Sequence, residues 1–182
     1  MLKNSQSRYG MVSIIVHWLV AVTVFGLFAV GFWMVDLSYY SSWYRTAPHW
    51  HKSVGILLAM VMLFRLFWRF ISPPPAPVAS HKGWERLTAA AVQLALYLGI
   101  TLLVITGYLI STEDGRPVQV FGWFEVPALG QLFNKQADIA GVIHEYTAYT
   151  LISLAVLHGL AAVKHHVIDK DATLQRMFGR KP

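Results

Sequence analysis

The chain has 182 residues, of which 55% are hydrophobic and 13% are charged, and it has no cysteine. This composition is more apolar than that of a globular domain and predicts an integral membrane protein. Without cysteine the chain cannot form disulfides, hold iron–sulfur clusters, or attach a cofactor through sulfur. The net charge of +6 does not indicate nucleic acid binding, because the basic residues gather in the segments between apolar runs, as membrane topology requires.

Four apolar runs are each long enough to cross a hydrocarbon core of about 30 Å, which takes about 20 helical residues. We therefore expect an all-α fold, an integral membrane four-helix bundle that forms a single domain over residues 1–182. The first run exceeds the apolar part of a cleaved signal peptide, so we interpret it as a retained span. The predicted spans cover residues 12–35, 48–70, 87–111 and 139–163.

The basic residues indicate the orientation of these spans. Most of them lie at the N-terminus, in the loop between the second and third runs, and at the C-terminus, whereas acidic residues share the other two loops. The positive-inside rule then places both termini in the cytoplasm.

The first run carries His17 near its cytoplasmic end, followed one turn later by Ala21. Gly31 comes fourteen residues after His17. Since a helix advances about 100° per residue, Gly31 lies on the same helix face near the outer end. Small residues beside a histidine leave room for a cofactor, although they also allow close helix packing in lipid.

Two histidines begin the second run, and they compete for the same role. His49 and His51 differ by about 200° around the helix, so only one of them can face the bundle core. His51 is followed one turn later by Gly55, whereas His49 is followed by Ser53. This difference favours His51.

The connectors have distinct characters. The proline-rich segment 72–77 is expected to be a stiff, extended connector that ends the second helix on the cytoplasmic side. The third loop, 112–138, lies outside and is the longest, and its part 118–124 is apolar but too short to span. We expect 118–124 to lie on the membrane surface or to cap the bundle from outside.

The fourth run carries His144 and His158, fourteen residues apart. This spacing places both on one helix face and separates them by about 21 Å along the axis. Ala148 and Ala162 follow them by one turn. Imidazole is costly to bury in hydrocarbon without a partner, so histidines within spans are functional candidates.

Topology then pairs the histidines by depth. His17 and His158 lie near the cytoplasmic side, and His51 and His144 lie near the outer side. This arrangement predicts two bis-histidine haem sites in the core of a four-helix bundle. A divalent-metal transporter is disfavoured, because it would need histidines and carboxylates that converge at one depth, and the span centres have no Asp or Glu.

Several polar residues on the cytoplasmic side allow two interpretations. Either Arg65 and Arg69 bind the haem propionates of the inner site, or they mark the membrane boundary. His165 follows His158 by seven residues and so lies on the same helix face. Either His165 and His166 bind a quinone headgroup or a haem propionate, or they form a polar helix end. We favour the polar helix end, and we assign no role to His81.

The chain resembles the bacterial cytochrome b561 family, which is related to the cytochrome b subunits of nickel hydrogenases. The resemblance covers the whole chain, and no single motif is very specific, but the four histidines occur in the right order and spans. The motifs that carry it are His17-Trp18-Leu19, His51-Lys52-Ser53-Val54-Gly55, His144 with His158, and the tail from Lys164-His165-His166 to Asp171-Ala172-Thr173-Leu174.

The resemblance implies two non-covalent haem b groups. His17 and His158 would be the axial iron ligands of the inner haem, and His51 and His144 those of the outer haem. It also implies a bacterial inner membrane protein that passes electrons to ubiquinone, and in some members of the family superoxide is the periplasmic donor. The expected partners are membrane lipid, the quinone pool and a periplasmic donor, and no nucleic acid.

Two functions remain open at this point. The first is electron transfer across the inner membrane from a periplasmic donor, with superoxide as a candidate, to ubiquinone; this would be an oxidoreductase of the superoxide:quinone type. Lys52 and Arg116 near the outer face could attract an anion, or they are ordinary loop charges. The second is a haem-bearing membrane anchor or electron-transfer subunit of a larger dehydrogenase or hydrogenase. No catalytic residue is assigned in either case.

Overall fold

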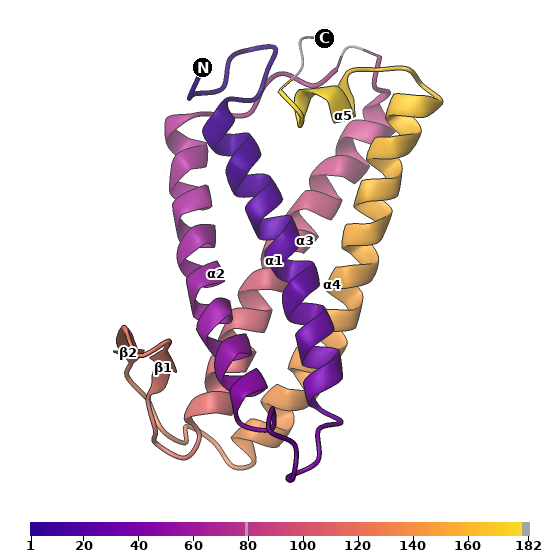
Figure 1. The fold of residues 1–182 in the computed structure, drawn as a ribbon. Helices are drawn as coiled ribbons and strands as arrows, with labels where there is room; N and C mark the ends of the chain where they lie inside the picture. Colours follow the sequence, from indigo (N-terminus) through magenta and orange to yellow (C-terminus); the bar gives the residue numbers. More distant parts are fainter. Residues whose placement is uncertain (79, 180–182) are drawn as a thin grey trace.

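A computed structural model describes residues 1–78 and 80–179. Four long helices form a bundle (Figure 1), and each is long and apolar enough to cross a membrane, as the hydropathy of the sequence predicts. A fifth, short helix, α5 (Thr173–Arg176), follows the bundle. The four long helices are α1 (Met11–Met34), α2 (Thr46–Ile71), α3 (Gly83–Thr112) and α4 (Gln136–Val167).

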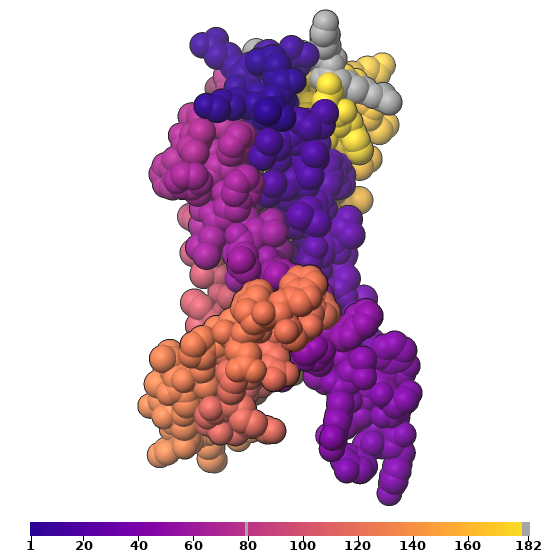
Figure 2. Space-filling model, turned by 60° about the vertical axis from the view of Figure 1, so that its left-hand side comes forward, coloured from indigo at the N-terminus to yellow at the C-terminus, as the bar shows by residue number. Residues whose placement is uncertain are grey.

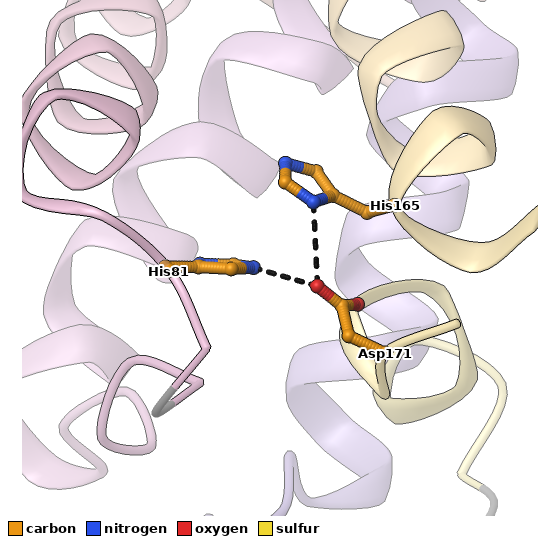
Figure 3. Close-up of side chains that lie close together, drawn as sticks. All are labelled: His81, His165 and Asp171. Carbon is orange, nitrogen blue, oxygen red and sulfur yellow. Dashed lines mark hydrogen bonds and ion pairs between the residues drawn. The ribbon is translucent and has the colours of Figure 1, made fainter. Parts of the chain in front are cut away.

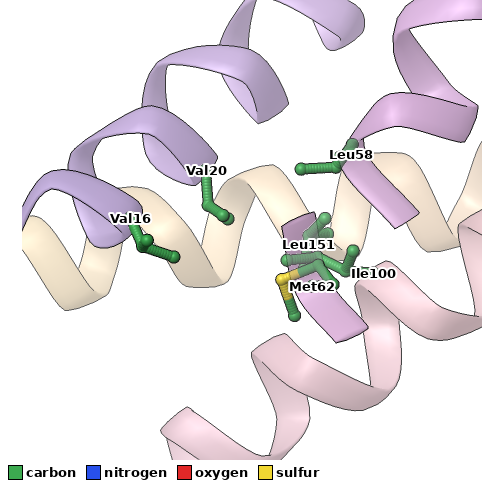
Figure 4. Close-up of a cluster of buried hydrophobic side chains, with 6 residues drawn as sticks. All are labelled: Val16, Val20, Leu58, Met62, Ile100 and Leu151. Carbon is green, nitrogen blue, oxygen red and sulfur yellow. The ribbon is translucent and has the colours of Figure 1, made fainter. Parts of the chain in front are cut away.

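A small apolar cluster holds the middle of the bundle (Figure 4). Leu151 of α4, which is 3% exposed, lies midway in sequence between His144 and His158. A Cβ at Gly99 of α3 would come within 2.9 Å of Leu151 Cδ1, so glycine permits α3 and α4 to approach closely at this depth. The cluster comprises Val16, Val20, Leu58, Met62, Ile100 and Leu151.

Most other apolar side chains face outward. In the most apolar 18-residue stretch of each long helix, only 6–11% of the residues are buried within the structure. Such a surface would be a liability in water, but it matches the hydrocarbon of a bilayer.

The N-terminal segment, the connector 72–82 and α5 lie together at one end of the bundle, which we call the α5 end (Figure 1). The amide nitrogen of Asn4 donates to Ser72 Oγ at 2.8 Å, and the amide of Ala76 donates to the carbonyl of Gln6 at 2.9 Å. Arg176 Nη1 donates to the carbonyl of Ala76 at 2.8 Å. These bonds join three segments that are distant in sequence.

A β-hairpin lies at the opposite end, the hairpin end. Strands β1 (Val118–Val120) and β2 (Phe124–Val126) pair antiparallel, so the fold has a small β element that the all-α expectation did not include. Ser53 of α2 binds the hairpin, because its hydroxyl donates to the carbonyl of Gln119 and accepts from the amide of Phe121, both at 3.2 Å.

Residues 118–124 include strand β1, which packs against α2 about two turns from the start of that helix (Figure 1). Val120 is fully buried, and Figure 2 shows the loop after α3 lying across the hairpin end of the bundle. The hairpin turn has positive φ at Phe121 (48°) and Gly122 (74°). The loop between the paired residues Val120 and Phe124 has three residues and begins with these two. Two successive positive-φ residues in a hairpin turn are usually Asn-Gly or Asp-Gly, so Phe-Gly gives a much weaker sequence signal.

Candidate functional site

The structure brings the four histidines of the spans together in two pairs. The ring centroids of His51 and His144 are 6.3 Å apart with an interplanar angle of 65°. Those of His17 and His158 are 6.4 Å apart, also at 65°. These are the same pairs that topology predicts, formed by α2 with α4 near the hairpin end and by α1 with α4 near the α5 end.

The separation within each pair suits a metal ion held between two rings. A metal–imidazole bond of about 2 Å, with about 1.2 Å from the nitrogen to the ring centre, puts two opposed ligands about 6.4 Å apart between centroids. Both pairs have this spacing within 0.1 Å, although α4 is joined by α2 in one pair and by α1 in the other. The apolar cluster around Leu151 lies between the two pairs.

A cavity of about 680 Å³ adjoins the pair near the hairpin end. All four long helices line it, and both His51 and His144 face it. Its volume is within the usual range of about 300–1,000 Å³ for sites of small molecules and cofactors. Most of its other lining residues are apolar, among them Val24, Leu27, Phe28, Ile56 and Ile152.

Two glycines make room for the histidine rings of this pair. A Cβ at Gly31 would lie 3.2 Å from His51 Cε1, and a Cβ at Gly107 would lie 3.3 Å from His144 Cε1. Both distances are tighter than ordinary van der Waals contact, so larger residues would displace the rings. At Gly55, by contrast, a Cβ would meet nothing within 4 Å, because this glycine borders the cavity.

Thr106 of α3 orients His144, a role that the sequence analysis missed. The Thr106 hydroxyl donates to the carbonyl of Leu102 at 2.7 Å, so its oxygen is left to accept from Nδ1–H of His144 at 3.0 Å. With the proton on Nδ1, the lone pair of Nε2 is available for a metal. The sequence signal is weak, because Thr106 is one of several polar residues in a largely apolar span.

The hydrogen bond from His144 to Thr106 leads to a testable prediction. The isosteric change Thr106→Val should weaken cofactor retention at the His51–His144 pair by about 10- to 100-fold, as expected for loss of a partner that orients a ligand. Thr101→Val is a matched control, since Thr101 is exposed and, within the described part of the chain, its hydroxyl bonds only to the carbonyl of Tyr97 at 2.9 Å. Cofactor titration of purified protein measures both, and equal affinities would refute the role of Thr106.

Arg65 points toward the pair near the α5 end. Its Nε donates to the Tyr97 hydroxyl at 2.8 Å, its guanidinium carbon lies 5.4 Å from the centre of the Tyr97 ring, and its Nη2 lies 3.4 Å from His17 Nδ1. This orientation favours a role within the bundle over that of a membrane boundary marker.

The other histidines lie outside the two pairs. His49 packs edge-on against Phe121 of the hairpin turn, with centroids 6.1 Å apart, so His51 is the one that faces the core. His165 approaches His81 and Asp171 at the α5 end. The sequence indicates no role for His81, and this grouping is not evident from it.

The chain is similar to known proteins over most of its length. A family model described as prokaryotic cytochrome b561 matches residues 8–180. The chain belongs to the prokaryotic cytochrome b561 family. It is 53% identical over 177 residues to cytochrome b561 homolog 2 of Escherichia coli (strain K12). The match covers 97% of this chain and 94% of the relative. Like its family, this cytochrome is a multi-pass bacterial membrane protein that carries b-type haem and takes part in electron transport.

More distant relatives have more specific names. The probable superoxide oxidase CybB of Yersinia pestis is 28% identical over 96% of this chain and 97% of its own length. The probable Ni/Fe-hydrogenase B-type cytochrome subunit of Rhodobacter capsulatus is 22% identical over 70% of this chain and 59% of its own length.

Proposed function

We propose that this cytochrome binds two non-covalent haem b groups and transfers electrons across the inner membrane from a periplasmic donor to ubiquinone. His51 and His144 would hold the outer haem, and His17 and His158 the inner one. The observation that carries the proposal is the pair of matching histidine–histidine spacings at two depths. When bound, each haem supplies one-electron redox chemistry, and two axial histidines leave no open position for oxygen.

The protein residues orient the ligands and supply charge. Thr106 keeps the proton on Nδ1 of His144, and the same tautomer is needed at His17 if Nε2 is its metal-binding atom. Nδ1–H of His17 could then not accept from Arg65, so the guanidinium would be free to pair with a haem propionate. Arg65 thus fits the propionate role better than Arg69.

The sidedness of the proposal rests on charge. The α5 end carries Lys3 and Arg8 of the N-terminal segment, Arg69 at the end of α2 and Arg176 of α5. The hairpin end carries Asp114 and Glu125. By the positive-inside rule, the α5 end is cytoplasmic and the His51–His144 pair faces the periplasm.

Superoxide is the donor that the outer cavity suits best, and it is the substrate in the name of the Yersinia relative. Lys52 lines the cavity next to His51, where its positive charge would attract an anion. Arg116 fits this role less well, because it pairs with Asp114, and the hydrogen bonds from Arg116 lower the pKa of that carboxyl.

Stopped-flow mixing of the oxidised holoprotein with superoxide tests the proposal. We expect rapid haem reduction, followed by reoxidation when ubiquinone is present. Lys52→Gln should slow the reduction several-fold at low ionic strength, and added salt should shrink the difference because it screens the charge. Arg45→Gln, which removes a charge at the same end outside the cavity lining, is the control. If superoxide reduces no haem, the donor assignment is wrong.

A second function, a haem-bearing subunit of a larger redox complex, has one observation in its favour. The segment between α1 and α2 exposes several aromatic side chains at the hairpin end, where a partner protein could bind them; in Figure 2 this segment projects from the bundle. The Rhodobacter relative is named as such a subunit. Affinity purification from native membranes would separate the two functions. The exposed aromatic residues are Tyr39, Tyr40, Trp43 and Tyr44.

A further inference from the structure

Three side chains from three separate segments meet at the α5 end (Figure 3). His81 comes from the connector before α3, His165 from the last turn of α4, and Asp171 from the segment that follows α4. Asp171 Oδ2 lies 2.9 Å from His81 Nε2 and 3.3 Å from His165 Nδ1. The two rings have centroids 4.6 Å apart. One potential ligand atom from each residue lies within 4.8 Å of the other two.

The cluster is shielded from solvent. The side chains of His81, His165 and Asp171 are 15%, 16% and 6% exposed. Nδ1 of His165 is fully buried and has no hydrogen-bond partner among the described residues, although Asp169 Oδ2 is only 2.8 Å away and Asp171 Oδ2 is also near. The two carboxylate oxygens are thus close to His165 Nδ1 but not aligned to accept a hydrogen bond from it. A cation bound by the nitrogen and the oxygens together would satisfy this buried atom.

The charged groups around the cluster have a net negative charge that a divalent cation could balance. Glu85 and Asp169 adjoin it, and their ligand atoms form a second close group with His165. Lys164 Nζ lies 2.6 Å from Asp169 Oδ2 and 3.8 Å from Glu85 Oε1. The three carboxylates together with this one ammonium group leave two negative charges when both imidazoles are neutral. A divalent metal ion would balance them.

We propose that His81, His165 and Asp171 bind a Zn²⁺ ion. Two imidazole nitrogens and one carboxylate oxygen are the donors that Zn²⁺ accepts, whereas Mg²⁺ and Ca²⁺ require oxygen ligands. Asp171 is already oriented for this role, because the amide of Thr173 donates to its Oδ1 at 2.8 Å and leaves Oδ2 to the cluster. Asp169 or a water molecule would complete the tetrahedron.

Such an ion would add a further link between segments that hydrogen bonds already join. It would link the connector between α2 and α3, the end of α4 and the start of the tail. His165 follows His158 by seven residues, which is about 10.5 Å along the helix. The proposed zinc site therefore lies closer to the α5 end than the His17–His158 pair does, and the two sites have no ligand in common.

Zinc titration of the purified, haem-loaded cytochrome in detergent tests the proposal. Isothermal titration calorimetry should find one Zn²⁺ per chain, and His81→Ala and His165→Ala should each weaken its binding at least about 100-fold, more than loss of an outer-shell partner would. Zn²⁺ should also raise the thermal unfolding temperature of the native protein but not of these variants. Mg²⁺ should produce neither effect.

His166→Ala is the matched control, since His166 adjoins His165 on α4 but is not in the cluster. It should retain full zinc affinity. An unchanged haem absorption spectrum in each variant shows that the bundle has folded, so this test does not depend on the electron donor or on quinone. The proposal is overturned if Zn²⁺ does not bind saturably, or if His81→Ala and His165→Ala bind it as tightly as the native chain.

Discussion

Replacing His144 by alanine is expected to remove one of the two proposed haems from the purified cytochrome and to leave the other in place. His144 is half of the pair near the hairpin end, and alanine offers no ligand to the iron. The remaining His17–His158 pair is separated from this site by the apolar cluster around Leu151, so it should keep its own haem. A pyridine haemochrome assay should therefore give half the native haem content per chain.

The pairing makes this prediction specific. His51→Ala should leave the same reduced-minus-oxidised spectrum as His144→Ala, while His17→Ala and His158→Ala should both leave the complementary one. His49→Ala is the matched control, because His49 is two residues from His51 but packs against Phe121, and it should keep both haems. If His51→Ala and His144→Ala retained different haems, the assignment of ligands to sites would be wrong.

The histidine pairs could be predicted from the sequence because they depend on only two regularities. Helix periodicity puts His144 and His158 on one face of their helix. The distribution of charge indicates which ends of the four spans lie on the same side of the membrane. The same reasoning places Gly31 at the depth of the outer pair, and the structure has it against His51. These inferences require no knowledge of side-chain packing.

The parts that the sequence did not reveal depend on contacts between segments. The role of Thr106 exists only because α3 brings its hydroxyl within 3.0 Å of a histidine on α4. The cluster of His81 with Asp171 joins residues 90 positions apart through loops, which have no periodicity to indicate their direction. The turn at Phe121 lacks favourable turn chemistry, but Ser53 of α2 holds the chain where the turn begins, through the carbonyl of Gln119 and the amide of Phe121.

Replacing Gly31 by valine is expected to impair the outer haem site without removing a ligand. A Cβ at this position would lie 3.2 Å from His51 Cε1 and 3.7 Å from its Nδ1, and the branched γ carbons of valine would add further contacts. The ring would have to rotate away from the geometry that faces His144. Because the ligand is displaced but still present, we expect outer haem affinity to fall by about tenfold or more, comparable to the loss of a residue that orients a ligand.

Gly26→Val separates this effect from a general effect on the helix. Gly26 lies in α1 as well, but a Cβ there would meet nothing within 4 Å. Both substitutions put a β-branched residue into the same span, so any change in helix propensity or lipid contact is common to both. Haem titration should therefore find weakened outer binding in Gly31→Val alone, with the inner haem retained in both variants. Equal loss in the two would mean that Gly31 serves helix packing, and that the close approach of His51 to α1 does not determine the site.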